Sequence, residues 1–292
     1  MTSSKSSSSS LWRNDRNLGA LLWGAAALST AIIFLIASFL LSEAWPVLKA
    51  IGVTRFVSDS GWYPLEKSFG LAPMFGATII VSVLAMLIAV PTGIASAVLC
   101  RFVAVPRLAQ IFRGIIALLA GIPSVVYGFW GLTVLVPLIA KIQAPGASLL
   151  AASLVLALMV LPTIALTTDA AIEAVPKSYW QGATALGLSR EAAIVKVILP
   201  ASRATIGAGI LLAAARALGE TMAVLMVAGN VVQFPTSLFD PMRTLTANIA
   251  LEMAYATGDH RSALFVSGLA LTALVMMLAI LAWRISGGRV HG

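Results

Sequence analysis

The sequence predicts an all-α polytopic membrane protein with six transmembrane helices, and three observations lead to this prediction. Of the 292 residues, 60% are hydrophobic and 10% are charged, whereas soluble domains contain about 25% charged residues. Six apolar runs reach the length of about 20 residues that a helix needs to cross a bilayer. Five of the six contain no charged residue. We place these spans at 18–41, 74–99, 114–140, 147–168, 204–229 and 262–283.

The first run is expected to be a membrane helix and not a cleaved signal peptide. It covers residues 18–41, which is longer than the usual apolar core of a signal peptide, and no small-x-small cleavage site follows it. Residues 1–17 before it form a Ser-rich, low-complexity tail, which we expect to be disordered and cytoplasmic.

Lys and Arg residues predict the orientation, because cytoplasmic loops carry an excess of both. With both termini in the cytoplasm, the cytoplasmic segments hold twelve of the 19 Lys and Arg residues and the outer loops hold six. The net charge of +8 is therefore mostly a topology signal. Since these charges do not gather with aromatic residues on one soluble face, nucleic-acid binding is excluded.

Residues that carry catalytic or metal chemistry are sparse. The single cysteine, Cys100, and the two histidines, His260 and His291, are too scattered to form a metal cluster. No Gly-rich phosphate-binding loop of the Walker type is present. We therefore expect a non-catalytic chain that binds no metal, no cofactor and no ATP.

A polar segment at about 170–203 separates the fourth and fifth apolar runs. Pro176 suits the first turn of a helix, and Gly187 suits the left-handed position after a helix end. Ser189 is a suitable cap for a second helix that would run to Pro200. The segment therefore predicts two short helices and a sharp turn, projecting from the membrane towards a partner.

Arg216 and Glu220 are the only charged residues within a predicted span. Their spacing of four places both on one helical face, with Ala213 and Gly209 towards the cytoplasm. In hydrocarbon such charges cost several kcal/mol unless they are paired or face water. Two compatible interpretations remain. One is a structural Arg–Glu pair; the other, which we favour, puts Arg216 on an anion path with Glu220 holding it between turnovers.

The third span contains residues that favour a bend. Gly121, Pro123 and Ser124 lie near its middle, and a proline within a helix frees a carbonyl and bends the helix. Such a bend serves gating in some membrane proteins, but proline is also common in membrane helices. Both interpretations of Pro123 stay open.

Several motifs resemble the phosphate-specific ABC-importer permeases of the Pst type, closest to the C-type subunit, over about residues 55–285. The polar segment is similar to the cytoplasmic EAA loop of ABC-importer permeases, with its spacing kept at Gln181-Gly182-Ala183, Gly187 and Val197-Ile198-Leu199-Pro200. Other matching segments are 62–73, 121–128, 161–163, 216–224 and 238–246. The chain departs from the family pattern at Gln181, where the family has Glu, at Gly182, where it has Ala, and at Arg101-Phe102, where an acidic residue is common.

The resemblance implies a type I ABC-importer permease core over residues 74–285 in a prokaryotic inner (plasma) membrane. It implies several partners besides membrane lipid: a second, PstA-like permease, two PstB-like ATPase subunits that use ATP and Mg, and an extracytoplasmic PstS-like phosphate-binding protein. The site residues it implies are Arg216, Glu220 and Thr221 on the substrate pathway, Gly121, Pro123 and Ser124 at the bend, and Gln181, Gly182, Ala183, Gly187 and Pro200 in ATPase coupling.

Three other functions stay open. One is a permease for molybdate or sulfate, because a basic residue binds these oxyanions as it binds phosphate. An ion-coupled secondary transporter would use the Arg–Glu pair as a proton relay, but no inverted repeat is evident. A non-transporting scaffold or sensor subunit would tolerate loss of Arg216.

Overall fold

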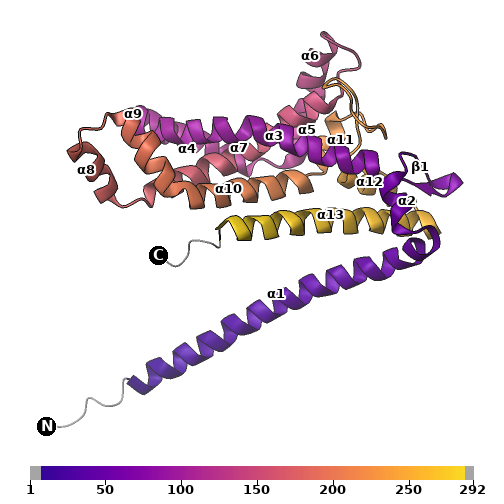
Figure 1. Ribbon diagram of the computed structural model, residues 1–292, viewed down its shortest axis with the longest axis horizontal. Helices are drawn as coiled ribbons and strands as arrows, with labels where there is room; N and C mark the ends of the chain where they lie inside the picture. Colours follow the sequence, from indigo (N-terminus) through magenta and orange to yellow (C-terminus); the bar gives the residue numbers. More distant parts are fainter. Residues whose placement is uncertain (1–7, 287–292) are drawn as a thin grey trace.

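The structure, a computed structural model, describes residues 8–286 as a bundle of long helices (Figure 1). Five helices in this range are long and apolar enough to cross a membrane, and a bent pair supplies a sixth span. The spans are built from α1 (Ser8–Ile51), α3 (Ala72–Val98), α4 (Pro106–Gly121), α5 (Ser124–Trp130), α7 (Leu149–Glu173), α10 (Leu199–Gly219) and α13 (Gly258–Ser286). Shorter helices are α2 (Val53–Ser58), α6 (Val136–Ala140), α8 (Lys177–Ala185), α9 (Arg190–Ala193), α11 (Met222–Val227) and α12 (Leu245–Glu252).

The remaining elements are a two-stranded β-hairpin, one 3₁₀ turn and three π-helical turns. Strands β1 (Trp62–Tyr63) and β2 (Ser68–Phe69) pair antiparallel, with Trp62 opposite Phe69. The turns are the 3₁₀ turn η1 (Pro64–Glu66) and the π-helical turns η2 (Leu99–Val103), η3 (Gly131–Leu135) and η4 (Ile194–Ile198).

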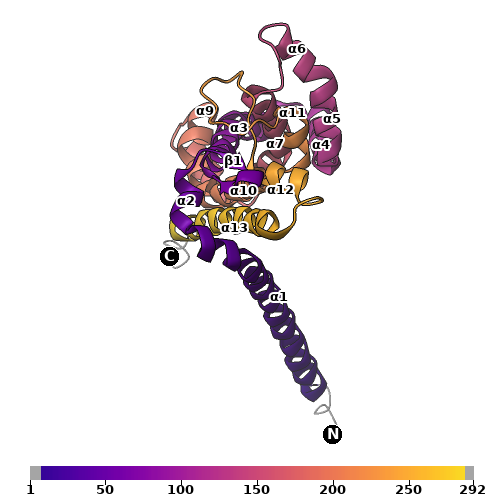
Figure 2. The same ribbon diagram turned by 90° about the vertical axis from the view of Figure 1, so that its right-hand side faces the viewer.

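Helix α1 diverges from the other helices over most of its length (Figure 2). Its C-terminal part packs against α13 through the buried side chains Ala44 and Val47, whereas its apolar residues before Ser42 are mostly exposed. Of the tail that we expect to be disordered, residues 1–7 lie outside the described residues. From Ser8 onward the chain is helical, since no Pro or Gly separates Ser8 from the apolar run.

The core lies around α7, which packs against α3 on one side and α10 on another. Ser148 caps this helix, because its hydroxyl oxygen accepts a hydrogen bond from the Ala151 amide at 3.3 Å. Glycines allow the close packing: a Cβ on Gly93 would lie 2.8 Å from the Ile164 side chain. Helix α7 therefore lies at the centre of the bundle, with α3, α4 and α10 packed against it.

The third span, predicted over residues 114–140 with residues that favour a bend near Pro123, is bent by 97° between α4 and α5. Pro123 lies in the break and has no amide hydrogen to donate to the Leu119 carbonyl. That carbonyl accepts from the Tyr127 hydroxyl at 2.7 Å and from the Ile122 amide at 3.3 Å. The side chain of Tyr127 is buried, so the carbonyl freed by the proline is satisfied inside the protein.

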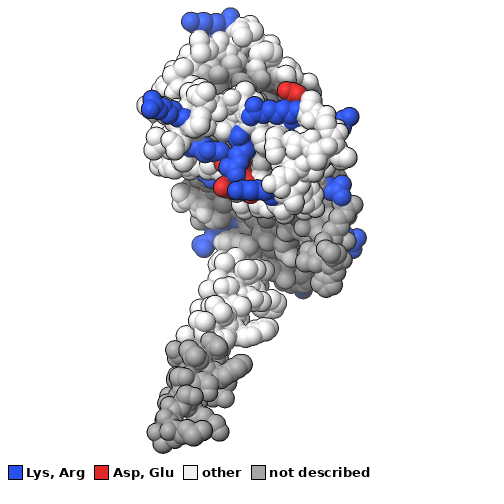
Figure 3. All heavy atoms as spheres, turned by 90° about the vertical axis from the view of Figure 1, so that its left-hand side faces the viewer, with Lys and Arg blue, Asp and Glu red and all other residues white. Residues whose placement is uncertain are grey.

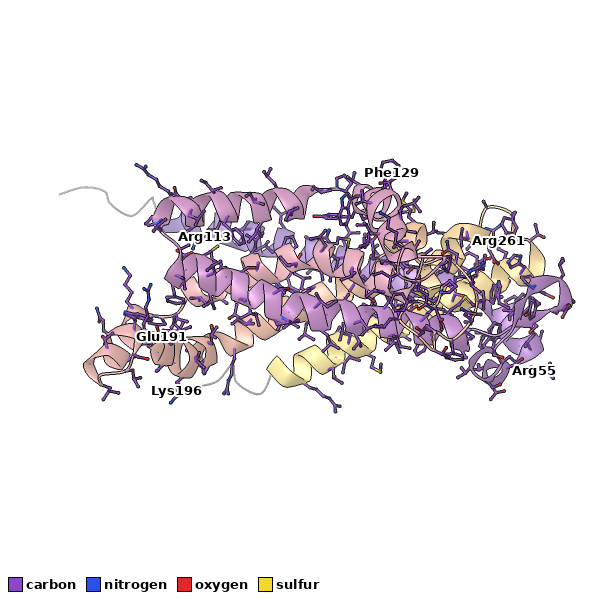
Figure 4. The ribbon with its side chains drawn as sticks, turned by 90° about the horizontal axis from the view of Figure 1, so that it is seen from above. Arg55, Arg113, Phe129, Glu191, Lys196 and Arg261 are labelled. Carbon is purple, nitrogen blue, oxygen red and sulfur yellow. The ribbon has the colours of Figure 1, made fainter. Side chains whose placement is uncertain are left out.

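The two ends of the bundle carry different elements (Figure 1). Helices α8 and α9 form one end, and the β-hairpin lies near α12 at the opposite end. Figure 4 places Arg113, Glu191 and Lys196 towards the α8–α9 end, and Arg55 and Arg261 towards the hairpin end. The candidate site residues are distributed between these ends along α5, α10 and α11.

Candidate functional site

The fifth span is broken where the sequence predicts one continuous helix with Arg216 and Glu220 on the same face. Helix α10 ends at Gly219, and Glu220 has an extended backbone with ψ of 133°. The Glu220 carboxylate accepts a hydrogen bond from the Ala223 amide at 3.1 Å, at the start of α11. The shared-face prediction is therefore wrong, because the carboxylate satisfies a free amide of the next helix. Within residues 8–286 no ion pair joins Arg216 to Glu220.

Helix α12 holds this break from the side. The Thr246 hydroxyl donates to the Glu220 carbonyl at 2.9 Å, and the Leu245 amide donates to the Thr78 hydroxyl oxygen of α3 at 3.0 Å. The Thr221 hydroxyl donates to the Gly219 carbonyl at 3.3 Å. Carbonyls near the end of α10 are thus satisfied by side chains, which stabilises a break inside an apolar span.

Arg216 lies on the exposed side of α10. Leu212, one turn earlier, is 61% exposed, and Thr205 and Ala208 continue the same exposed stripe. Arg216 lies 17 residues after Leu199, which corresponds to about 26 Å along the helix. That distance is close to the hydrocarbon thickness of about 30 Å. Arg216 therefore lies near the end of α10 that is far from Leu199, on the exposed side of the helix.

The small residues that we expected beside Arg216 lie elsewhere. Ala213 is fully buried, and a Cβ on Gly209 would overlap the Thr167 hydroxyl of α7. Gly209 and Ala213 therefore form the packing face of α10 and not an open path. This expectation is wrong because the small side chains serve close contact between two helices.

Helix α5, which follows the bend, packs against α11, which follows the break in the fifth span. Gly121 is the last residue of α4, Pro123 precedes α5, and Ser124 begins α5. One turn later, a Cβ on Gly128 would lie 2.9 Å from the Ala223 Cα of α11. Gly128 thus allows α5 and α11 to pack closely.

Helices α8 and α9 have the turn that the sequence predicts. Gly187 has a φ of +74°, its amide donates to the Thr184 carbonyl at 3.0 Å, and the Leu188 amide donates to the Ala183 carbonyl at 3.1 Å. This pair of bonds is the Schellman motif. Ser189 caps α9 by accepting from the Ala192 amide at 3.2 Å.

The second helix of this segment does not stop at Pro200, contrary to the prediction. Helix α9 continues through the π-helical turn η4 into α10, so residues 190–219 form one helical stretch. Pro200 directly follows η4 within this stretch, as the second residue of α10. Helix α8, whose helical residues begin at Lys177 just after Pro176, carries the exposed Gln181 and Gly182 and the buried Ala183.

Two charged clusters escape sequence reasoning. Arg113 of α4 forms a bidentate pair with Asp169 of α7, with Nε–Oδ2 and Nη2–Oδ1 distances of 2.9 and 3.1 Å. The predicted fourth span ends at residue 168, so Asp169 counts as a loop residue in the sequence. The only available signal is that Asp169 directly follows the apolar run.

The second cluster surrounds the buried Glu252 of α12. Its carboxylate accepts from Arg243 Nη1 at 2.7 Å and from Trp62 Nε1 at 2.8 Å, and it lies 2.8 Å from His260 Nε2. His260, which the sequence leaves without companions, is thus joined to the β-hairpin and α12. The cluster fixes the hairpin end of the bundle.

Comparisons with known proteins give a consistent result. Residues 89–291 match the family described as "Binding-protein-dependent transport system inner membrane component". A probable ABC transporter permease protein, YqgH of Bacillus subtilis (strain 168), is 38% identical over 86% of this chain and 81% of its own length. A phosphate transport system permease protein, PstC of Mesorhizobium japonicum, is 35% identical over 88% of this chain and 85% of its own length.

Solved structures agree at the level of the fold. A chain of a bacterial ABC transporter involved in the import of the acidic polysaccharide alginate superposes with a TM-score of 0.65 and 17% identity, covering 96% of this chain and 99% of its own. A chain of the MetNI methionine ABC transporter, in an inward-facing conformation, gives a TM-score of 0.58 and 17% identity, covering 79% of this chain and all of its own.

Proposed function

The chain belongs to the family of binding-protein-dependent transport system inner membrane components, and from this premise we propose that it forms, with a second permease, the path for inorganic phosphate in an ATP-driven importer. The family, the relatives and the fold confirm the coarser predictions: a PstC-like, type I ABC-importer permease, multi-pass in the inner membrane. They also confirm that the chain is of a non-catalytic class.

The observation that carries the substrate proposal is the exposed Arg216 at membrane depth. A guanidinium facing lipid there costs several kcal/mol, so its side of α10 is expected to face water or another chain. Its planar fork of donors matches the oxygens of an oxyanion. The PstC relatives, named as phosphate transport permeases, favour phosphate among the oxyanions.

Glu220 and Thr221 border this part of the path in the proposal. A carboxylate repels an oxyanion, but the Glu220 carboxylate is engaged by the Ala223 amide and sits at the start of α11. The partial positive charge of a helix start compensates part of that negative charge. Glu220 thereby leaves the Arg216 charge available for the substrate.

The bend at Gly121, Pro123 and Ser124 is the proposed gating element of the third span. At this break the Leu119 carbonyl of α4 accepts a hydrogen bond from the Tyr127 side chain of α5. Since α5 packs against α11 at Gly128, a change in the bend angle would move the end of the fifth span.

Helices α8 and α9 are the proposed docking element for an ATPase subunit. The residues proposed for coupling are Gln181, Gly182, Ala183 and Gly187 in α8 and the turn after it, and Pro200 at the start of α10. Tyr179 is 50% and Leu186 is 82% exposed on an otherwise polar projection, which favours a protein partner. Figure 3 shows Lys and Arg side chains across this end, which supports its cytoplasmic placement together with both termini. ATP and Mg would be used by the ATPases, and an external binding protein would deliver phosphate.

The test is uptake of labelled phosphate, sulfate and molybdate by vesicles that contain this chain, its companion permease, the ATPase and the binding protein. We expect ATP-dependent phosphate uptake, which Arg216→Gln abolishes while the complex still assembles. Uptake of sulfate or molybdate instead would overturn the substrate, and uptake without ATP would overturn the importer assignment. Full phosphate uptake by Arg216→Gln would overturn the role of Arg216.

A further inference from the structure

An aromatic stack joins the docking helix α8 to the end of α3. The Phe102 ring, in the π-helical turn η2, lies parallel to the Trp180 ring of α8, with a centroid distance of 5.5 Å and an interplanar angle of 14°. Both side chains are half-buried. Trp180 and the buried Ala183 are three residues apart, so they form the inner face of α8, whereas Gln181 lies on the exposed face.

An ion pair lies directly beside this stack. Arg101 Nη2 lies 3.4 Å from Glu173 Oε1, and Glu173 is the last residue of α7. The two neighbouring residues of η2, Arg101 and Phe102, therefore contact the last turn of α7 and the helix that follows it.

A second pair fixes the other side of the same junction. Asp169 lies one turn before Glu173 on α7 and forms the bidentate pair with Arg113 of α4. The end of α7 is thus tied to η2 through Glu173 and to α4 through Asp169. Because only residues 104 and 105 separate η2 from α4, the junction joins four segments: α3, α4, α7 and α8.

The covalent connections of α8 do not include α3 or α4. Helix α8 follows α7 through residues 174–176 and leads through α9 and η4 to α10. A displacement of α8 therefore reaches the fifth span along the chain, but it reaches α3 and α4 only through side-chain contacts. The parallel rings of Phe102 and Trp180 are the direct contact of this kind.

The backbone at Phe102 is suited to a change of shape. The hydrogen bonds of a π-helical turn join residues five positions apart, compared with four in an α-helix, and such turns occur frequently at functional positions. In η2 the turn closes through the Ala104 amide, which donates to the Leu99 carbonyl at 2.8 Å. A push on the Phe102 ring thus acts on this turn, directly before the start of α4.

We infer that the Phe102–Trp180 stack transmits movement of the docking helix α8 to α3 and α4, as a second route beside the chain connection to α10. This inference rests on the proposed docking of α8 on an ATPase subunit. Trp180 and Phe102 act as positioning residues: they touch neither the anion nor the nucleotide. Their loss leaves the parts assembled and lowers the transport obtained from each ATP.

The test measures phosphate taken up per ATP hydrolysed by the assembled importer in vesicles. Phe102→Ala and Trp180→Ala are each expected to lower this ratio by about fivefold or more, the usual range of coupling between sites. The double variant should be no worse than either single variant, because both remove the same contact. Phe102→Tyr and Trp180→Phe keep aromatic rings and should restore the ratio.

Val103→Ala is the matched control, since Val103 follows Phe102 in η2 and is 67% exposed. An unchanged ratio in Phe102→Ala overturns the inference, and so does failure of both alanine variants to assemble, which makes the stack a structural support. If the wild-type importer itself shows no ATP-dependent uptake, the proposed function fails first. The two failures are therefore distinguishable.

Discussion

Arg216 and Glu220 lie four residues apart but form no ion pair in the part of the chain that the structure describes, because Glu220 caps α11. Glu220→Gln keeps an oxygen that accepts from the Ala223 amide, so we expect near wild-type stability and uptake. Glu220→Ala removes the acceptor and is expected to cost about 1 kcal/mol. Thermal unfolding of the purified complex, followed by uptake, measures both effects. Loss of uptake in Glu220→Gln with normal stability would show that the charge itself is needed.

Gly209 permits the close contact between α10 and α7, and a matched glycine lies two residues before it. Gly209→Ala places a methyl group against Thr167, which we expect to destabilise the protein by about 1 to 3 kcal/mol. At Gly207 a Cβ has no atom within 4 Å. Gly207→Ala is therefore expected to be neutral or to stabilise by up to about 1 kcal/mol. Equal thermal stability of the two variants would contradict the packing face assigned to α10.

The Tyr127 hydroxyl satisfies the carbonyl that Pro123 leaves free at the bend. Tyr127→Phe keeps the ring and leaves the Leu119 carbonyl with the Ile122 amide as its donor, so we expect a cost of about 1 kcal/mol. Thermal unfolding of Tyr127→Phe alone and in combination with Pro123→Ala checks the assignment. In the Pro123→Ala background an amide hydrogen is available again, so the cost of Tyr127→Phe should shrink. An equal cost in both backgrounds would sink the account of the bend.

The Glu252 cluster ties the β-hairpin to α12 and α13. Glu252→Gln removes the charge that Arg243 and His260 face, and we expect a loss of about 3 kcal/mol, typical of breaking a buried pair. Asp259→Asn is the control, because its pair with Lys67 is exposed and is worth less than about 1 kcal/mol. The thermal unfolding midpoint of each variant gives the comparison. A stability loss in Asp259→Asn as large as that in Glu252→Gln would contradict the cluster.

Features that depend on neighbouring residues are predictable from the sequence. The turn at Gly187 and the cap at Ser189 are local, so residue type and spacing suffice to predict them. The six spans follow from apolar length alone. The end of α10 at Gly219 is not predictable in this way, because one of its partners, Thr246, lies on another helix.

The two charged clusters are not predictable from the sequence for the same physical reason. Arg113 and Asp169 are 56 residues apart, and Trp62 and Glu252 are 190 residues apart. Arg113 and Asp169 each lie beside the end of an apolar run, and Trp62 and Glu252 lie in the segments between such runs. Only the packing of α4 on α7, and of the hairpin on α12, brings the partners within hydrogen-bond distance.

The most direct test of the anion path is the accessibility of position 216 to water in the assembled importer. Arg216→Cys and Ala213→Cys, each in a Cys100→Ser background, would be treated with a membrane-impermeant thiol reagent. Ala213 is fully buried one turn away and serves as the matched control. We predict that the cysteine at 216 reacts and that the cysteine at 213 stays unlabelled. A cysteine at 216 that reacts no faster than the one at 213 would contradict the path.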